Sequence, residues 1–537
     1  MTPTNFLSEV RRRRTFAIIS HPDAGKTTLT EKLLLYTGKI QEAGEVKAKA
    51  HRRKTVSDWM ELEKQRGISI SSSVLQFDFE NLRINLLDTP GHKDFSEDTY
   101  RTLMAADTAV MVIDAAKGVE TQTKKLFEVC RMRNIPILTF VNKMDREARD
   151  PFELMKELED VLKITANPVT WPIGMGDRFK GVYHRLKKEF HFFEPSEKVG
   201  DRAQLKVLSC EIGDKALLQY VDEEQQLKLI EDMELLDGAL GNVEKSSFLS
   251  GVLTPTLFGS ARNNFGISSF LQIFHDFTPA PQPKEAKPKE VKPEDPDFSA
   301  FVFKIQANMD KNHRDRMAFM RICSGRFERD MDVKIARNQK PVRLSHSKQF
   351  MAQERATVDE AYAGDIIGVH DSGNFKIGDT VYCGKPIEFL GIPQFSPECF
   401  GRLTLRDPMK RKQLQKGISE LCEEGLVQMF IDPRVGEQDP ILGVVGVLQF
   451  DVMMFRLQDE YRVEARLERL PYEIARWVKS QDESIKLEAQ DLRVPLLRDQ
   501  HNQWVVLCKS EWELQFLKKN LPPSLQWFSN SFEALKI

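Results

Sequence analysis

The chain has 537 residues, and at roughly 100–200 residues per domain this length predicts about three domains rather than a single core. Hydrophobic residues make up 41% and charged residues 29% of the sequence, ordinary globular values that exclude a disordered or fibrous chain. Lys and Arg total 78 against 80 Asp and Glu, so the formal net charge is −2, which excludes a protein that coats nucleic acid through bulk positive charge.

The sequence also argues against membrane insertion and export. No apolar run approaches the ~20 residues that cross a bilayer, and the N-terminus has no signal-peptide core or cleavage site. We interpret the four arginines Arg11–Arg14 as a solvated lead-in to the first strand. The seven cysteines form no C-x-x-C pair, a pattern typical of reduced thiols in a cytosolic protein. We therefore expect a cytoplasmic protein with neither a membrane nor DNA as a partner.

Strands and helices alternate over the first 145 residues. Three of the expected strands, at 15–20, 109–114 and 136–141, are short apolar runs, which usually indicate burial on both faces of a parallel sheet. All the expected strands together cover residues 15–20, 74–80, 83–88, 109–114 and 136–141, with a crossover helix near 120–133. This pattern predicts a doubly wound α/β domain, in which ligands bind beyond the carboxyl ends of the strands.

Residues 146–250 interrupt this alternation with charged helical stretches such as 223–236, and they read as an insertion. A buried strand at 255–260 and a helix at 267–277 then resume the pattern. We expect a nucleotide-binding domain over 1–278 with an inserted subdomain at about 160–250.

The segment 278–297 holds six prolines in 20 residues, a density that prevents a packed core and predicts an extended spacer, with the linker placed at 279–297. Residues 298–390 follow as short alternating runs punctuated by glycine, which predicts a small β-barrel. Residues 391–537 mix helix and strand and predict an α+β domain. A helix should start at Asp407-Pro408 and end near Gly425, and Leu448, Val452 and Phe455 should share one face of a later helix.

The strongest chemical signal is the segment Ser20–Thr27, SHPDAGKT, between a predicted buried strand and a predicted helix. The phosphate-loop template asks for Gly, four residues and Gly-Lys-Ser/Thr, so only the first glycine is replaced, by Ser20. Gly25 lets the backbone approach the phosphates, Lys26 neutralises the β- and γ-phosphates, and Thr27 offers a hydroxyl to Mg²⁺. The segment predicts a nucleoside triphosphate site.

Three further motifs follow in chain order, each at the end of a predicted strand: Asp88–His92 (DTPGH), Asn142–Asp145 (NKMD) and Gly259–Ala261 (GSA). Asp88 places an acid near the metal. Asp145 can accept two hydrogen bonds from the guanine N1–H and 2-amino groups, which adenine cannot offer, and a backbone N–H of the GSA motif can bind the guanine O6. The set predicts a GTPase rather than a P-loop ATPase or kinase.

The segment Arg66–Ser71 (RGISIS) lies between the phosphate loop and Asp88, where a GTPase switch must lie. Ser69 could then supply a hydroxyl to Mg²⁺ only while the γ-phosphate is present. The alternative is a polar lead-in to the strand at Val74.

His21 within the phosphate loop, RGISI, DTPGH, NKMD and GSA together resemble the translational GTPases, the relatives of elongation factors Tu and G. SHPDAGKT, SDWMELEKQRGISI, DTPGHKDFSEDTYRTL, FKIQANMDKNHRDRMAFMR and GVLQFDV are most similar to the bacterial peptide-chain release factor three family, and the similarity spans nearly the whole chain. Translational GTPases usually carry threonine where this chain has Ser69. Ser20 and Pro22 depart from the elongation-factor loop, yet both suit the release factor three family.

The resemblance implies a multidomain α/β fold: a doubly wound P-loop GTPase domain with an insertion, a β-barrel domain II and an α+β domain III. It implies GTP or GDP and Mg²⁺ as ligands. The metal would be held by Thr27, Ser69 and, through water, Asp88, and His92 would orient the attacking water with Lys26 as the second catalytic residue. The expected GTP-binding residues are Ser20, His21, Pro22, Asp23, Ala24, Gly25, Lys26, Thr27, Asp88, Thr89, Pro90, Gly91, His92, Asn142, Lys143, Met144, Asp145, Ser260 and Ala261.

By resemblance, the GTP-bound protein engages a ribosome that still carries a class I release factor after peptide release. It drives that factor off without reading the stop codon, then hydrolyses GTP and departs. The expected partners are ribosomal RNA and proteins and the class I release factors, and the protein itself is expected to be a monomer.

Two basic segments are candidate contacts with ribosomal RNA. One is a run of cations, Arg402, Arg406, Lys410, Arg411, Lys412 and Lys416, and the other is the predicted loop Asn312–Arg316. A solvated helix face explains the run of cations equally well.

Two other functions compete. The first is another ribosome-dependent GTPase. A translocase needs more domains than the 147 residues after 390 can hold (537 − 390 = 147). A tRNA carrier would show a second barrel, where 408–460 looks helical. A nucleotide-gated scaffold that does not hydrolyse GTP is the other, and His92 argues against it.

Overall fold

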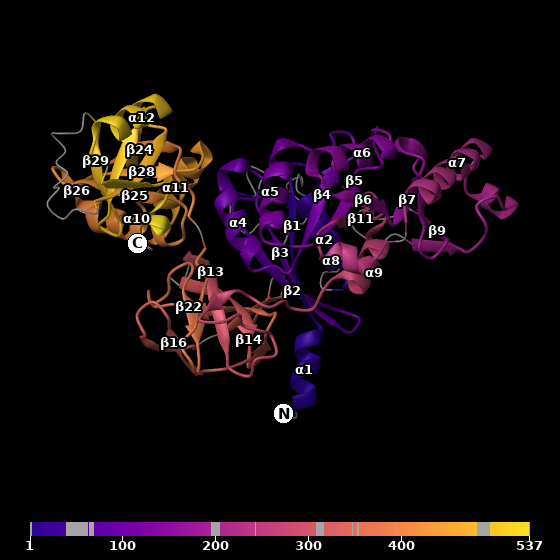
Figure 1. The fold of residues 1–537 in the computed structure, drawn as a ribbon, viewed down its shortest axis with the longest axis horizontal. Coiled ribbons are helices and arrows are strands. Elements are labelled where there is room, and N and C mark those ends of the chain that lie inside the picture. The colour runs from indigo at the N-terminus through magenta and orange to yellow at the C-terminus, as the bar shows by residue number, and fades with distance from the viewer. Residues whose placement is uncertain are drawn as a thin grey trace.

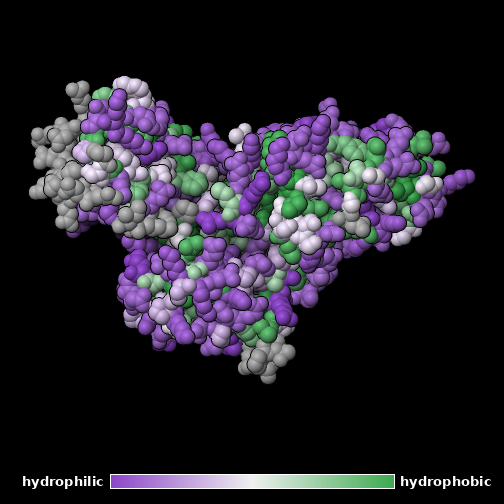
Figure 2. Space-filling view, in the orientation of Figure 1, coloured by the Kyte–Doolittle hydropathy of each residue, from purple (hydrophilic) through white to green (hydrophobic). Residues whose placement is uncertain are grey.

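The computed structural model describes residues 3–38, 63, 69–194, 204–241, 243–307, 316–345, 347–351, 354–392, 394–480, 494–522 and 524–535. Figure 1 shows the N-terminal α/β part in the centre, the inserted lobe around α7 and β9 at the right, the barrel below and the C-terminal part at the upper left. Within these residues no helix is long and apolar enough to cross a membrane. In the view of Figure 2 the surface is mostly hydrophilic, with hydrophobic residues in scattered patches.

The N-terminal part is built on a seven-stranded sheet, parallel except for the antiparallel pairing of its first two strands. The sheet confirms the expected strands within one or two residues. Its order is β2 (Ser73–Phe79), β3 (Leu82–Asp88), β1 (Arg13–Ser20), β4 (Thr108–Asp114), β5 (Ile137–Asn142), β11 (Leu253–Phe258) and β6 (Thr165–Pro168).

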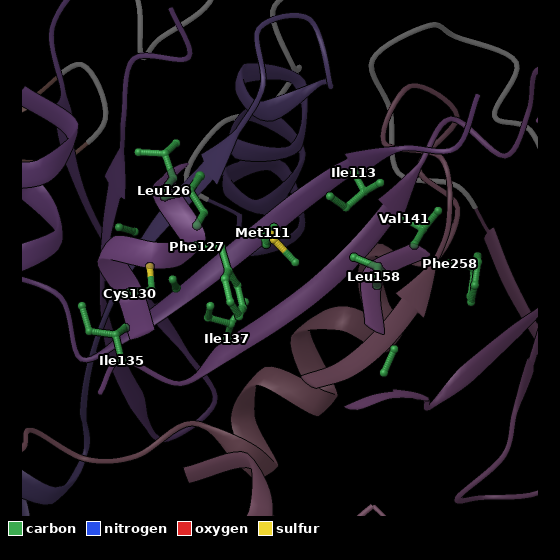
Figure 3. Close-up of a cluster of buried hydrophobic side chains, with 14 of the residues drawn as sticks. Met111, Ile113, Leu126, Phe127, Cys130, Ile135, Ile137, Val141, Leu158 and Phe258 are labelled. Carbon is green, nitrogen blue, oxygen red and sulfur yellow. The ribbon is translucent and has the colours of Figure 1, made fainter. Parts of the chain in front are cut away.

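Helices cover both faces of this sheet, so every residue of the central strand β4 is buried. In β4, Val110 and Val112 join the core beneath α2 and α9, whereas Met111 and Ile113 join the core beneath α5 and α6. Figure 3 shows the second core, where Phe127 of α5 lies near Met111 and Ile137. The helices of this part are α1 (Pro3–Arg11), α2 (Lys26–Tyr36), α4 (Ser96–Met104), α5 (Thr121–Met132), α6 (Pro151–Leu162) and α9 (Ile267–Phe277), with the 3₁₀ turn η1 (Lys93–Phe95).

The insertion forms its own antiparallel four-stranded sheet. Its order is β10 (Gln204–Leu208), β9 (Glu189–Glu194), β8 (Gly181–His184) and β7 (Thr170–Ile173), accompanied by α7 (Glu223–Ala239), α8 (Lys245–Leu249), η2 (Gly176–Arg178) and η3 (Lys215–Gln219). We expected the insertion to begin near residue 160, but α6 packs on β6, and β6 pairs with β11 in the main sheet. The extra sheet therefore begins after Pro168.

The proline-rich segment differs from the spacer that we expected. Lys284 and Val291 form a β-bridge, β12 (Ala286–Lys287) pairs with β23 (Glu388–Phe389), and Val291 is only 3% exposed. The prolines prevent a core of the segment's own, as expected, but its apolar side chains enter the core that the neighbouring parts share. The segment is therefore packed against its neighbours at points such as Val291 and β12, while many of its charged residues stay exposed.

The next part is the expected β-barrel. Its main sheet has the order β17 (Pro341–Arg343), β16 (Asp332–Ile335), β22 (Thr380–Tyr382), β13 (Ser299–Ala307), β14 (Arg316–Ser324), β21 (Ile366–His370), β18 (Lys348–Met351) and β19 (Glu354–Thr357), and β15 (Arg326–Glu328) pairs separately with β20 (Glu360–Tyr362). Alternating residues of β13 and β14, among them Val302 and Met320, fill its interior.

The C-terminal part is α+β, as expected. Its sheet has the order β27 (Ala465–Leu470), β24 (Cys399–Leu405), β26 (Gly436–Val444), β25 (Gln428–Asp432), β29 (Leu496–Asp499), β30 (Trp504–Cys508), β28 (Ile474–Ser480) and β31 (Leu525–Phe528). Its helices are η4 (Pro408–Lys410), α10 (Arg411–Glu423), α11 (Val447–Asp459), α12 (Glu511–Asn520) and α13 (Ser531–Leu535). The Asp407 side chain caps η4 by accepting from Met409 N at 3.0 Å, and Gly425 follows α10 with a φ of 74°.

Buried ion pairs join the barrel to the N-terminal sheet. Arg321 of β14 pairs with Asp107, both side chains being 1% exposed, and also donates to Thr15 Oγ1. Arg13 donates to Asp365 at 2.8 Å. Burial lowers the pKa of Arg13, but Asp365 and Glu9 more than compensate and hold that pKa above its ordinary value. Our interpretation of Arg11–Arg14 as solvated is therefore wrong for Arg13, since the buried Asp365 needs a cation.

Arg321→Met should lower the free energy of unfolding by about 3–5 kcal/mol, because it leaves the Asp107 carboxylate buried without its closest cation. The control Arg329→Met removes a half-exposed guanidinium that pairs with Asp359, and should cost about 0–1 kcal/mol. Urea unfolding of both variants measures the difference. Equal losses would contradict the importance of the buried pair.

Candidate functional site

The phosphate loop connects β1 to α2 at the carboxyl edge of the sheet. Gly25 has a φ of 100°, and a Cβ there would lie 2.2 Å from Asn142 Nδ2, so only glycine fits. Asp23 also has a positive φ, 64°. Gly25 is the N-cap of α2, so the first free N–H groups of that helix face the loop, an arrangement that attracts phosphate.

Asn142 holds three loops of the site together. Its Nδ2 donates to Ala24 O at 2.8 Å in the phosphate loop, and its Oδ1 accepts from Ala261 N at 2.9 Å in the GSA loop. Asn142 itself is 2% exposed at the end of β5. One buried amide therefore aligns the loops that we assign to the phosphates and to the base.

Lys143 adds a second link, which involves a residue that the motifs did not reveal. Its Nζ donates to Asp23 O at 2.6 Å and to Asp114 Oδ2 at 2.7 Å. Burial would raise the pKa of Asp114, but the hydrogen bonds from Lys143 and from Ala116 N outweigh it and hold that pKa below its ordinary value. Asp114 is the last residue of β4, and its place at the carboxyl end of a strand was the only feature of the sequence that could have marked it as part of the site.

Asp145 has the geometry of a base-reading residue. Its Oδ1 is buried and makes no hydrogen bond within the described chain. The neighbouring Met144 is fully buried, and its N–H donates to Gly259 O at 3.1 Å, which fixes the loop. A buried carboxylate oxygen without a donor fits two N–H groups of a guanine, since an unmet acceptor there costs free energy.

The backbone N–H groups of the GSA loop already donate hydrogen bonds within the protein, which we did not expect. Ser260 N donates to Phe265 O at 3.0 Å, and Ala261 N donates to Asn142. A contact between Ala261 N and the guanine O6 would require this donor to be shared with Asn142. The assignment of Ser260 and Ala261 to the base therefore stays a prediction.

The start of the phosphate loop is held from the side of α5. Ser20 Oγ donates to His21 O at 2.7 Å, and His21 N donates to Thr123 Oγ1 at 3.2 Å. His21 Nε2 lies 3.2 Å from Glu120 Oε1. Pro22 packs against Gly91, where an added Cβ would lie 3.2 Å from Pro22 Cα. These residues shape the loop, and their contact with GTP stays a prediction.

Two of the three predicted metal ligands, Thr27 and Ser69, meet at the N-terminus of α2. Thr27 Oγ1 lies 3.4 Å from Ser69 Oγ, although 42 residues separate them. Asp88 is 2% exposed at the end of β3, and Lys26 is 7% exposed. The two hydroxyls, together with the carboxylate of Asp88 at the end of the strand that pairs with β1, are oxygen donors of the kind that Mg²⁺ prefers. Of the switch motif, Arg66, Gly67 and Ile68 lie outside the described residues.

His92 lies beside the phosphate loop. Thr89 Oγ1 donates to Ile18 O at 2.6 Å and Thr99 Oγ1 donates to Pro90 O at 3.0 Å, so the DTPGH loop is anchored at Thr89 and Pro90. A Cβ on Gly91 would lie 2.9 Å from Lys26 Nζ, which shows how close the two loops are. The His92 side chain is 31% exposed and caps η1 by accepting from Asp94 N.

The end of the switch segment is held by buried polar groups. Ile70 N and Ser71 N donate to Glu63 Oε1 at 2.9 and 3.1 Å. Ser72 donates to Asp98 of α4 through both N (2.7 Å) and Oγ (2.6 Å).

Lys304 of the barrel completes this arrangement by donating to Ser71 Oγ and Ser72 O. Burial of the ammonium lowers the pKa of Lys304. The charges of Asp98, Glu63 and Glu424 act in the opposite direction but do not outweigh burial. We did not predict this role for Lys304, because no local motif marks a residue 232 positions from its partner.

The C-terminal part meets the same region. Arg101 of α4 donates to Glu424 O at 3.3 Å, and Glu424 Oε1 accepts from Ala307 N of the barrel at 2.9 Å. Leu448, Val452 and Phe455 share one face of α11, as expected, and this face packs on Ile70 and Phe95. Three parts of the chain therefore meet at the residues that follow Ser69. We call the residues that join these parts the switch junction. They are Glu63, Ser69–Ser72, Asp98, Lys304 and Glu424.

The two basic candidates for RNA contact differ. The run of cations lies on β24 and around the start of α10, where Arg406 is within 3.8 Å of Glu464 and Lys416 within 3.5 Å of Glu420. These pairs are largely exposed, so both interpretations of the run remain. Asn312, His313, Arg314 and Asp315 lie outside the described residues. Arg316 donates to Asp371 of the barrel at 2.7 Å and also pairs with Glu423 of α10.

Comparison with known proteins places the three parts in three families. The profile of the elongation factor Tu GTP binding domain matches residues 11–280, that of elongation factor G domain 2 matches 297–384, and that of the class II release factor RF3 C-terminal domain matches 389–518.

Whole proteins match over nearly their full length. The chain is 55% identical to a peptide chain release factor 3 of Symbiobacterium thermophilum over 515 residues, 96% of this chain and 97% of that protein. Proteins of the same name from Gloeothece citriformis and Trichormus variabilis are 53% and 52% identical, covering 96% and 97% of this chain and 95% and 96% of their own. A crystal structure of a Thermus thermophilus protein shares the fold, with a TM-score of 0.69 at 22% identity over 88% of this chain and 71% of that one.

Asp145→Asn should weaken GDP binding at least tenfold and improve binding of xanthosine diphosphate. The Oδ1 of asparagine can still accept from N1–H, but its Nδ2 is a donor that suits the xanthine 2-oxo group and not the guanine 2-amino group. Hydrogen bonds to a charged acceptor contribute about 1.5–3 kcal/mol each. Titration calorimetry with both nucleotides measures the change, with the partly exposed Asp150→Asn as control. Unchanged preference for guanine would refute the base contact.

Proposed function

Because the chain belongs to the peptide chain release factor 3 family of translational GTPases, we propose that it clears class I release factors from the ribosome in a GTP-dependent step after the peptide has left. It is a translation termination factor that binds guanine nucleotide and hydrolyses GTP on the ribosome. The observation that carries the proposal is a release-factor C-terminal domain, residues 389–518, joined to a GTPase domain. We further propose that the protein acts as a cytoplasmic monomer.

The site residues divide by the part of GTP that they meet. We assign the phosphates to the loop Ser20–Thr27, with Lys26 at the β- and γ-phosphates, and the guanine to Asp145. Support comes from the left-handed Gly25, from Asp145 Oδ1, which is buried and has no hydrogen-bond partner among the described residues, and from the contacts of Asn142 with the loops. Lys143 and Asp114 hold the loop and the base-reading turn together.

We assign Mg²⁺ to Thr27, Ser69 and, through water, Asp88. When bound, the ion neutralises the charge that develops on the β- and γ-phosphate oxygens. Ser69 replaces a threonine that is usual in the wider family, so the hydroxyl remains while the methyl group is lost. Its position 3.4 Å from Thr27 supports a shared ligand, and it ties metal binding to the switch junction.

We assign the orientation of the attacking water to His92. An arginine finger that stabilises the transition-state charge contributes about 10³–10⁵ in rate, and the sequence shows no evident one. The isolated protein should therefore turn over slowly until the ribosome aligns the His92 ring. The partial exposure of His92, 31%, leaves it accessible to such a partner. A nucleotide-gated scaffold without hydrolysis would have no use for this residue.

His92→Ala should abolish ribosome-stimulated GTP turnover, while GTP affinity stays within a few-fold, because the ring meets the water and not the ground-state nucleotide. The same variant should still speed the departure of a labelled class I factor from post-termination ribosomes, since displacement precedes hydrolysis in this scheme. Stopped-flow fluorescence and phosphate release report the two steps separately.

His275→Ala, at a partly exposed histidine of α9 that pairs with Asp276, provides the matched control. A large loss of GTP affinity in His92→Ala would contradict its assignment to the attacking water. If the wild type with GTP leaves the class I factor in place, the proposed partner is wrong even where turnover is normal.

A further inference from the structure

His92 is connected to the C-terminal part through Asp94, two residues further along. Asp94 is 3% exposed, and its Oδ2 accepts from Leu448 N at 2.8 Å, at the first turn of α11. The contact joins residues 354 positions apart. In Figure 1, α11 lies on the side of the C-terminal part that faces α4.

Only a glycine at position 446 leaves room for the Asp94 side chain in this contact. A Cβ on Gly446, the residue before α11, would lie 2.1 Å from Asp94 Cγ. Gly446 has φ −145° and ψ 156°, an extended conformation that any residue adopts, so its lack of a side chain serves the approach to Asp94 and not the backbone. Ile70, Phe95 and Val452 form a buried apolar cluster, and Leu448 packs against it.

The same aspartate controls the state of the His92 ring. Asp94 N donates to His92 Nδ1 at 3.2 Å, so the neutral ring carries its proton on Nε2. Asp94 Oδ1 lies 3.4 Å from that Nδ1, but two acceptors face each other there and form no hydrogen bond. In this state Nε2 carries the proton, so it can donate a hydrogen bond but cannot accept one from an attacking water.

We propose that Asp94 is a positioning residue for His92 and that the docked N-terminus of α11 keeps it from acting. When the C-terminal part lifts away, Leu448 N–H leaves the carboxylate. Asp94 then accepts a hydrogen bond from Nδ1–H, the ring proton having moved from Nε2 to Nδ1 through solvent, with no net change in protons. Nε2 becomes the acceptor that holds the attacking water, as in other pairs where a carboxylate orients a histidine.

This proposal rests on the proposed role of His92 in hydrolysis, but its first test needs neither GTP nor ribosome. The ¹⁵N shifts of the His92 ring distinguish the two tautomers in the full-length protein at a pH about two units above the ordinary imidazole pKa of ~6.5. Comparison with His92→Gln assigns the signals among the ten histidines.

The wild type should show Nε2 protonated. Gly446→Ala, which pushes α11 off Asp94, should show Nδ1 protonated, and Gly446→Ala with Asp94→Ala should return to the first state. Leu448→Pro removes the donor itself at a helix position that tolerates proline, so it should act like Gly446→Ala even if the interface holds. Gly238→Ala, whose Cβ would meet nothing within 4 Å, is the control. One tautomer throughout Gly446→Ala and Leu448→Pro would overturn the proposal.

Kinetics provide the second test. Asp94→Ala should lower kcat of ribosome-stimulated hydrolysis by about 10²-fold, the lower end of general acid–base effects, with KM for GTP within twofold. Gly446→Ala should raise turnover without ribosomes several-fold. A raised KM with unchanged kcat in Asp94→Ala would show a structural role and overturn the assignment. Normal ribosome-stimulated turnover in His92→Ala, together with the expected tautomer change in Gly446→Ala, would instead refute the proposed function of His92.

Discussion

A buried ammonium, that of Lys304, connects the nucleotide site to the rest of the molecule. It belongs to the barrel, yet it donates to Ser71 Oγ and Ser72 O, two and three residues after the predicted metal ligand Ser69. A buried cation without its acceptors would be costly, so the barrel and the end of the switch segment are stable together only in matching positions. Movement of Ser69 therefore has to be transmitted to the barrel.

The switch junction extends this constraint to the C-terminal part. Asp98 holds Ser72 from α4, and the next turn of α4 carries Arg101, which donates to Glu424 O. The Arg321–Asp107 pair fixes the barrel at the other end of the same interface. Since interfaces of this kind are bistable rather than continuously deformable, a change of a few ångströms at Ser69 can select between arrangements of three parts. This gives a physical basis for a factor that binds the ribosome in one nucleotide state and leaves in the other.

The motifs that we assign to the nucleotide could be found in the sequence, whereas the contacts that connect them to the other parts could not. Gly25, Asp88 and Asp145 lie in short motifs at the ends of buried strands, where the fold alone brings loops together. Lys304 and Asp94 act on partners 232 and 354 positions away, so no local pattern marks them. Composition misled us twice, over Arg13 and over the proline-rich segment, because a charge run or a run of prolines says nothing about a buried partner elsewhere.

The most direct test of this coupling is the rate at which a labelled class I release factor leaves post-termination ribosomes in the presence of GTP and the Lys304→Met variant. The substitution keeps the apolar stem and removes the ammonium, leaving Ser72 O without its donor, a change worth about 1–3 kcal/mol. The account predicts near-normal GTP affinity together with at least a tenfold loss in the acceleration of factor release. Acceleration equal to the wild type, at full GTP occupancy, would contradict it.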